Sequence, residues 1–283
     1  MKNDFKGLDF HQTFKPERNC LISLLADLPE CSGKTVQEIS KITGIPTGAS
    51  SGKVVPSISY LEYMGLIATE LSNKRYDLEY TELGDCVLSE DPGLIEDLTL
   101  LLLHCMISRK KSGAVLWSYI ITVLLPKYHG KINKKNFDKE LELYFGKEVN
   151  VAPFNGTYTG LFEQLALLKI SSDKYTLQSH SLNKEFIYLY AYILYKYWDD
   201  WADGFSAKEK EENKISVTEI TAYQIEETGF RLPFGWTEQD EYHVLEALHD
   251  KKIISLNRQM TPFAVRKLST EEEIVSSLYS ELC

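Results

Sequence analysis

The sequence contains none of the short motifs that usually mark an enzyme site. There is no HExxH pair, no CxxC pair, no GxSxG elbow and no GxGxxG turn. His104 and Cys105 are adjacent, which is poor spacing for two ligands of one metal ion. The stretch 48–53 resembles a phosphate-binding loop, but it is one residue short and Val54 replaces the required Ser or Thr. We therefore expect no catalysis, no metal ion and no cofactor in this chain.

Regularly spaced cysteines and long apolar runs are also lacking. The five cysteines form no pattern, which is typical of reduced thiols in a cytosol rather than of a disulfide framework. The longest apolar runs, 98–107 and 115–125, are too short to cross a bilayer and contain polar residues. The first residues show no apolar core of a signal peptide. We expect a cytoplasmic chain without membrane contact.

Basic residues are scarce in this chain of 283 residues. It has 31 Lys and Arg against 41 Asp and Glu, a formal charge of -10, so the chain as a whole is not a basic nucleic-acid binder. The exception is residues 109–139, with eight basic residues against Asp138 alone. Two interpretations of this segment stay open: a solvated face, or a patch that contacts phosphates.

What the sequence does contain, at 35–84, is the pattern of a winged helix-turn-helix. Thr35 and Glu38 form a capping box at the start of a helix, which Gly44 ends. Gly65 is placed to end a second helix, and residues 72–75 are placed to form the tip of a hairpin. The expected core face of the second helix is Val54, Val55, Ile58, Leu61 and Met64.

The helix–hairpin order recurs twice more, at 162–177 and 245–262, with a turn expected at 154–156. The aromatic-rich segment 186–198 is expected to form a central buried helix. The acidic stretch 199–227 is expected to be a linker and a solvated helix.

These patterns together predict a mainly α protein built from winged helix-turn-helix units with short β-hairpin wings. The predicted segments are an arm and winged unit, a helical region with the basic segment, a second winged unit with the aromatic helix, and a C-terminal winged unit. Their boundaries are 1–90, 91–150, 151–205 and 206–283.

If the first winged unit binds DNA, its second helix enters the major groove and its hairpin reaches the backbone. Only one cation, Lys53, lies on that helix, so we expect weak, salt-sensitive binding to double-stranded DNA. The residues predicted to contact DNA are Ser51, Lys53, Ser57 and Tyr60 on the helix, Lys74 and Arg75 on the wing, and Arg109, Lys110, Lys111, Lys131, Lys134 and Lys135 in the basic segment.

The N-terminal element Phe10-His11-Gln12-Thr13-Phe14 places two aromatic rings around polar groups. We favour a structural interpretation, in which Phe10 and Phe14 are buried and His11 and Thr13 lie against the winged unit. The alternative is that His11 belongs to a functional site.

This element, the winged unit, Thr81-Glu82-Leu83-Gly84, the Asp91-Pro92 turn and His104 come in an order that resembles the bacterial domain-of-unknown-function family 4007. The resemblance covers about the first 110 residues. Family members open with a His-Glu-Thr-Phe element, and His11 and Thr13 match it, but Gln12 stands where glutamate is expected. Members are associated with sulfur-transfer enzymes of the phosphoadenosine-phosphosulfate-reductase type, in gene clusters for DNA phosphorothioation and phage defence.

Three hypotheses about function follow. The chain is a non-catalytic DNA-binding accessory or regulatory protein of a bacterial DNA-modification or phage-defence system, as the resemblance implies. Alternatively, its winged units are protein–protein scaffolds that bind a sulfur-transfer or other defence enzyme. The third hypothesis, an enzyme with an unrecognised site, requires a deep pocket lined by His11, His104 and acids.

Overall fold

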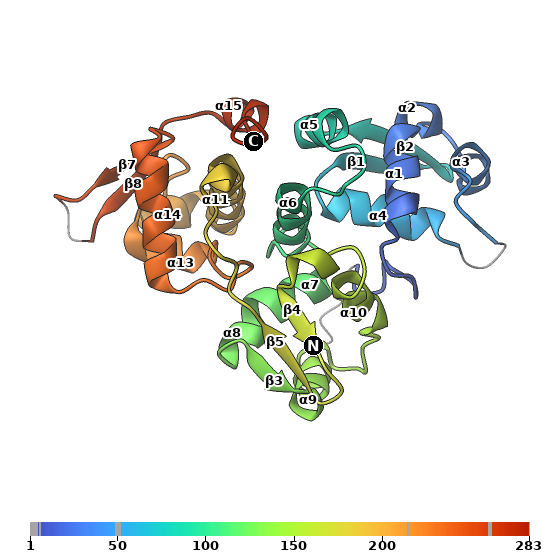
Figure 1. Ribbon diagram of the computed structural model, residues 1–283, viewed down its shortest axis with the longest axis horizontal. Helices are drawn as coiled ribbons and strands as arrows, with labels where there is room; N and C mark the ends of the chain where they lie inside the picture. Colours follow the sequence, from blue (N-terminus) through green and yellow to red (C-terminus); the bar gives the residue numbers. More distant parts are fainter. Residues whose placement is uncertain (1–4, 6, 49–51, 214, 260–261, 283) are drawn as a thin grey trace. The chain divides into compact units, whose positions relative to one another are not determined.

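The computed structural model describes residues 5, 7–48, 52–213, 215–259 and 262–282 (Figure 1). Its elements are mainly α-helices with small antiparallel sheets, which confirms the predicted fold class at that level. The chain divides into two compact units. The first contains residues 1–108 and 113–178, and the second contains residues 109–112 and 179–283.

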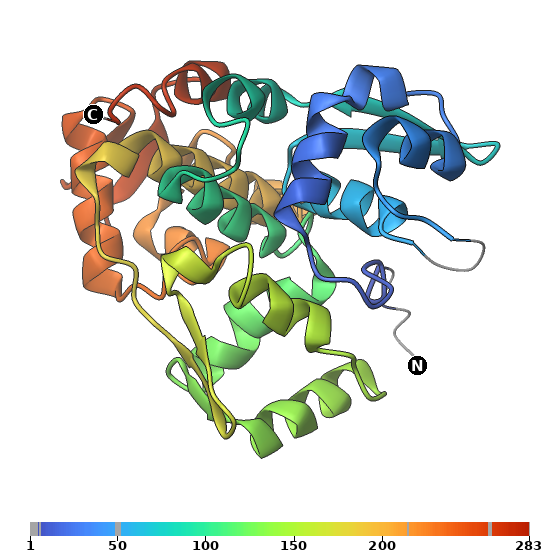
Figure 2. The ribbon, with the colours of Figure 1, turned by 45° about the vertical axis from the view of Figure 1, so that its right-hand side comes forward.

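The first half of unit 1 contains the stretch that the sequence marked most clearly. Thr35 and Glu38 form the predicted capping box, and Gly44 ends the helix with φ of 70°. The predicted hairpin also forms, and Figure 2 shows it extending past α3. The elements are α1 (Arg18–Ala26), α2 (Leu28–Cys31), α3 (Val36–Thr43), α4 (Val54–Tyr63), β1 (Ile67–Ser72), β2 (Arg75–Tyr80), α5 (Glu82–Glu90) and α6 (Asp97–Ile107).

The second half of unit 1 differs from expectation in two places. The predicted turn at 154–156 is wrong, because these residues lie inside a helix that begins at Ala152 and has Pro153 in its first turn, where the fixed φ of proline suits a helix. An unexpected strand, β3, pairs with the return strand of the second hairpin. The elements are α7 (Val115–Tyr119), a π-helix (Ile120–Leu124), α8 (Leu125–Lys127), β3 (Lys131–Asn133), α9 (Lys134–Phe145), α10 (Ala152–Tyr158), a 3₁₀ turn (Glu163–Leu165), β4 (Leu168–Ile170) and β5 (Lys174–Leu177).

Unit 2 is arranged around the aromatic helix α11, which is buried along most of its length as predicted. The acidic stretch is only partly the expected solvated helix, because it also contains β6 and α13. The elements are a 3₁₀ turn (Lys184–Phe186), α11 (Ile187–Ala202), α12 (Ala207–Glu212), β6 (Glu219–Thr221), α13 (Ala222–Thr228), α14 (Glu238–Asp250), β7 (Ile254–Asn257), β8 (Ala264–Lys267) and α15 (Glu271–Ser276). Met260 and Thr261, expected in the hairpin, lie outside the described residues.

One element order occurs three times in the chain: a helix, a strand or bridge, two helices and a hairpin. In the second and third repeats the first strand pairs with the last, giving sheet orders β3-β5-β4 and β6-β8-β7. In the first repeat the bridge between Lys34 and Tyr76 takes the place of that strand. The helices before the hairpins are α4, α10 and α14.

The N-terminal arm is fixed to unit 1 by an aromatic cluster around Trp117. The Trp117 ring lies 5.7 Å from Phe10, 6.0 Å from His11 and 5.6 Å from Phe154, measured between centroids. His11 is buried, and burial lowers its pKa from the usual value. The expected full burial of Phe10 and Phe14 is wrong, because both are only half-buried, and Thr13 is exposed. The arm therefore inserts its histidine, and the Phe10 ring lies against the histidine ring at 5.4 Å between centroids.

A buried carboxyl on α14 makes unit 2 sensitive to pH. The Glu241 side chain is buried, its nearest cation atom is Arg231 Nε at 3.9 Å, and burial raises its pKa to about 7. Its raised folded-state pKa means that stability is full below the unfolded pKa and falls as the pH rises toward 7.

We expect Glu241→Gln to lose this pH dependence, since an amide stays neutral. Urea unfolding at pH 5 and pH 8 should show the wild type losing about 1–3 kcal/mol more than the variant. The exposed Glu272→Gln, on α15 of the same unit, is the control. Identical losses in wild type and Glu241→Gln would contradict the assignment.

Candidate nucleic-acid interface

The face of α4 that was predicted to read DNA is not available in the structure. Ser57 is 5% exposed and Tyr60 is 1% exposed, so the prediction that both face outward is wrong. The Ser57 hydroxyl donates to the Lys53 carbonyl oxygen at 2.7 Å, and the Tyr60 hydroxyl donates to the Phe14 carbonyl oxygen at 2.9 Å. The reason is that α4 contacts α1, α3, α6 and β1, so elements cover it on more than one side. Val55, predicted as core, is only half-buried.

Ion pairs within unit 1 neutralise most of the predicted cations of this repeat. Lys53 Nζ lies 2.7 Å from a Glu17 carboxylate oxygen, and Arg75 lies 3.1 Å from Glu38 and also donates to the Gly33 carbonyl oxygen. Lys74 is exposed and has no carboxylate partner among the described residues. Ser51, the remaining predicted contact on this side, lies outside the described residues. The hairpin therefore offers one free cation where two were expected.

The two compact units divide the basic segment 109–139. Residues 109–112 belong to unit 2, whereas Lys131, Lys134 and Lys135 belong to unit 1. We therefore describe the two parts of the segment separately.

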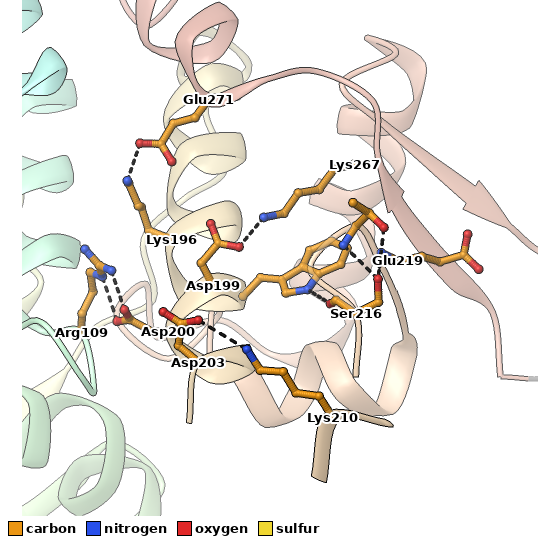
Figure 3. A network of polar contacts seen from close by, with 12 residues as sticks. Arg109, Lys196, Asp199, Asp200, Asp203, Lys210, Ser216, Glu219, Lys267 and Glu271 are labelled. Carbon is orange, nitrogen blue, oxygen red and sulfur yellow. Dashed lines mark hydrogen bonds and ion pairs between the residues drawn. The ribbon is translucent and has the colours of Figure 1, made fainter. Parts of the chain in front are cut away.

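Figure 3 shows Asp200 of α11 beside Arg109, the first residue of the part of the segment that belongs to unit 2. Two guanidinium nitrogens of Arg109 lie 2.9 and 2.5 Å from the two oxygens of Asp200, and both side chains are nearly buried. Lys111 Nζ donates to Asp203 at 3.3 Å, and Lys110 Nζ donates to the Glu227 carbonyl oxygen at 3.3 Å. Arg109 is thus nearly buried in its pair with Asp200, whereas Lys111 stays more than half exposed in its pair with Asp203.

A different set of cations lies together on the β3-β5-β4 sheet. Lys131 on β3 and Lys169 on β4 both pair with Thr176 on β5, so the three residues form one row across the sheet. Lys174 is two residues before Thr176 on the same strand and therefore points to the same face. We call Lys131, Lys169 and Lys174 the lysine face. The row Ile132–Tyr175–Ile170 takes the opposite face, where Ile132 and Tyr175 are buried.

The lysine face continues directly into the start of α9. Lys134 and Lys135 follow β3, and the Lys134 backbone N–H donates to the Asp173 carbonyl oxygen at 2.8 Å, which places it at the β4–β5 turn. All five lysines are exposed, and none has an ion pair among the described residues. The nearby carboxylate of Asp173 accepts a hydrogen bond from the Ser171 hydroxyl, which together with Lys174 lowers its pKa. Asp138, Glu142 and Glu148 line a hollow with Lys134, so these three acids and Asp173 leave the five lysines one excess positive charge.

Sequence reasoning found Lys131, Lys134 and Lys135 but missed Lys169 and Lys174. The sequence did not predict strand β3. Without that strand, the lysines of the β4–β5 hairpin could not be placed on the same face of a sheet as Lys131. In the third repeat the equivalent row of the sheet is Glu219–Arg266–Ser255, where Arg266 forms an ion pair with Glu219. The cationic surface is thus a property of the second repeat.

Two searches of the described residues were negative. No helix among them has both the length and the apolarity to cross a membrane. In the same residues, no group of three or more His, Cys, Asp or Glu side chains is placed to hold a metal ion.

Comparison with known proteins links the chain to one solved fold. No family model matches the sequence, and no curated protein matches it. The structure is similar to one described as the SspB crystal structure, with a TM-score of 0.65 and 15% identity over 98% of this chain and 87% of that chain. It is also similar to magnesium ion-bound SspB, with a TM-score of 0.65, 14% identity and the same coverage. At these identities the likeness establishes a shared fold.

Proposed function

We propose that this chain is a non-catalytic, DNA-binding accessory protein of a bacterial DNA-modification or phage-defence system. The observation that carries the proposal is the lysine face with Lys134 and Lys135: five exposed lysines without ion pairs in a chain that is acidic as a whole. A patch with an excess positive charge attracts nucleic-acid phosphates even when the net charge does not.

The three repeats support the proposal, since we interpret each as a winged helix-turn-helix. A helix, a first strand, two helices and a hairpin whose return strand pairs with the first strand is the order of that motif. The fold likeness to SspB and the resemblance to family 4007 are consistent with a role beside a sulfur-transfer enzyme in a phosphorothioation-type system. In this proposal α4 does not enter the major groove, and the second repeat contacts the DNA backbone.

Backbone contact of this kind predicts binding without sequence preference, in the range of roughly 10⁻⁴ to 10⁻⁶ M at physiological salt. Replacing Lys169 and Lys174 by alanine should weaken binding equally for all duplex sequences. It should also reduce the slope of log K against log salt by about 2, because each phosphate contact contributes roughly 0.9. Fluorescence anisotropy at several salt concentrations measures both quantities.

The matched control is Lys41→Ala with Lys184→Ala, which removes two exposed lysines without ion pairs elsewhere in the described chain. If this control flattens the salt slope as much as the lysine-face variant, the assignment of the surface is wrong. No binding at low salt would reject DNA contact altogether.

The second candidate function is a protein scaffold, and the acidic α14 favours it for unit 2. A DNA-binding repeat would not place Glu238, Glu246 and Asp250 on the helix before its hairpin, because they repel phosphates. A sulfur-transfer or other defence enzyme that copurifies at high salt would support this function for the third repeat. Elution alone at every salt concentration, with all system proteins coexpressed, would exclude it.

A further inference from the structure

A cavity of about 730 Å³ lies in unit 1, where the start of α1 meets the segment after α10. Lys15, Arg18 and Asn19 line it from one side, and Gly160, Leu161 and Gln164 line it from the other. None of the residues of the lysine face lines it.

Arg18 has more hydrogen-bonding capacity than its surroundings use. Its Nη2 makes two long contacts of 3.4 Å, to the Leu161 carbonyl oxygen and to Gln164 Oε1, and its buried Nε has no partner. None of its contacts among the described residues is to a carboxylate. Since Nε is buried, the Nη1 and Nη2 amino groups are the donors that a ligand can reach, and such a pair of donors matches two oxygens of a phosphate group.

The residue that contacts Arg18 from the other side of the cavity, Gln164, is neutral and is held in one orientation. Its Nε2 donates to the Ile95 carbonyl oxygen at 2.8 Å and to Asp97 Oδ1 at 2.7 Å. These two bonds set the orientation of the amide and leave its neutral Oε1 toward Arg18. Arg18 is therefore positioned by a neutral acceptor, and its charge remains uncompensated.

Lys15 brings a second cation to the cavity, and two glycines make room for it. A Cβ atom at Gly156 would lie 2.7 Å from Lys15 Cδ, and one at Gly160 would lie 3.6 Å from Lys15 Nζ. The Lys15 stem thus lies directly on the backbone of α10 and the residues after it. Lys15 has no carboxylate partner among the described residues.

The carboxylates at the cavity do not cancel these two charges. Glu17 is paired to Lys53, with both oxygens of Glu17 within 2.8 Å of Lys53 Nζ. Glu163 lines the edge and is exposed, which leaves one excess positive charge at the cavity.

We infer that this cavity binds a phosphate group, held by the Arg18 fork and by the Lys15 ammonium. The group has two sources, a free phosphate or phosphate monoester and a phosphate of a nucleic-acid strand. The inference stands even if the lysine face does not bind DNA, because it depends on other residues.

Isothermal titration calorimetry of the full chain with inorganic phosphate tests the inference. We expect a dissociation constant of about 1 mM, a value typical of a single small contact. Arg18→Gln should weaken binding on the order of tenfold, since a hydrogen-bonded charged contact is lost. Lys15→Gln should weaken it less, and Lys41→Gln, which removes an exposed lysine of α3, should leave it unchanged.

Two further arms identify the source and exclude a purely structural role. A 5′-phosphorylated single strand that binds more tightly than its 5′-hydroxyl counterpart indicates a terminal phosphate, and equal binding that Arg18→Gln weakens indicates backbone phosphates. Response to inorganic phosphate alone indicates a small ligand. Absence of phosphate binding, equal binding by Arg18→Gln, or a lowered melting temperature with unchanged affinity would overturn the inference.

Discussion

Asp200→Ala should lower the free energy of unfolding of unit 2 by about 3 kcal/mol, because it leaves the nearly buried Arg109 guanidinium without its counter-ion. Two hydrogen bonds to a charged acceptor are lost together, and Ser112 Oγ loses its contact with Asp200 as well. Unit 2 contains three of the four tryptophans, so intrinsic fluorescence during urea unfolding reports on this unit.

The neighbouring pair provides the control for this experiment. Lys111 and Asp203 are both more than half exposed, and an exposed pair contributes about 0–1 kcal/mol, so Lys111→Ala should have little effect. Replacing Arg109 and Asp200 together by leucine should recover much of the loss, since no unpaired charge then remains. A single Asp200→Ala variant as stable as the wild type would show that the ion pair does not hold unit 2 together.

Trp117→Ala should lower the stability of unit 1 by about 3–5 kcal/mol, the usual cost of removing a large buried ring. Its side chain is fully buried and contacts Phe10, His11, Tyr60 and Phe154. Its Nε1 has no hydrogen-bond partner, so the loss is one of packing and not of a hydrogen bond. Unfolding followed by circular dichroism measures the change.

The arm should become the most affected part of the variant, since Phe10 and His11 both contact the lost ring. Hydrogen exchange of residues 7–14 should therefore accelerate more than exchange in α3, which does not contact Trp117 in this cluster. Trp117→Phe retains most of the ring and is expected to cost less than half as much as the alanine variant. If exchange accelerates equally throughout unit 1, Trp117 does not have a specific role in holding the arm.

The starts of helices and the position of the first hairpin could be predicted from the sequence, because residues close together in the chain determine them. Thr35 and Glu38 fixed the start of α3, the polar tip fixed the β1–β2 hairpin, and Glu271 opens the predicted last helix. These features depend on neighbouring residues, so a short window of sequence contains the required information.

The candidate site could be predicted only in part, because it depends on which elements meet. The pattern of α4 indicated one buried face, but α1, α3, α6 and β1 all contact it and bury Ser57 and Tyr60. The basic segment is continuous along the chain, yet its first residue, Arg109, forms an ion pair with Asp200, which is distant in the sequence. Lys169 could be placed beside Lys131 only through Thr176, the residue to which both pair.

The short excursion of residues 109–112 from unit 1 into unit 2 limits how this protein can be cut. A fragment beginning at residue 179 would contain Asp200 but not Arg109, so the nearly buried Asp200 carboxylate would lose its counter-ion. A fragment ending at residue 178 would keep Arg109 on a loop with no acid to receive it. To study unit 2 by itself, residues 109–112 would have to be attached to the fragment or Asp200 replaced, because truncation alone removes Arg109.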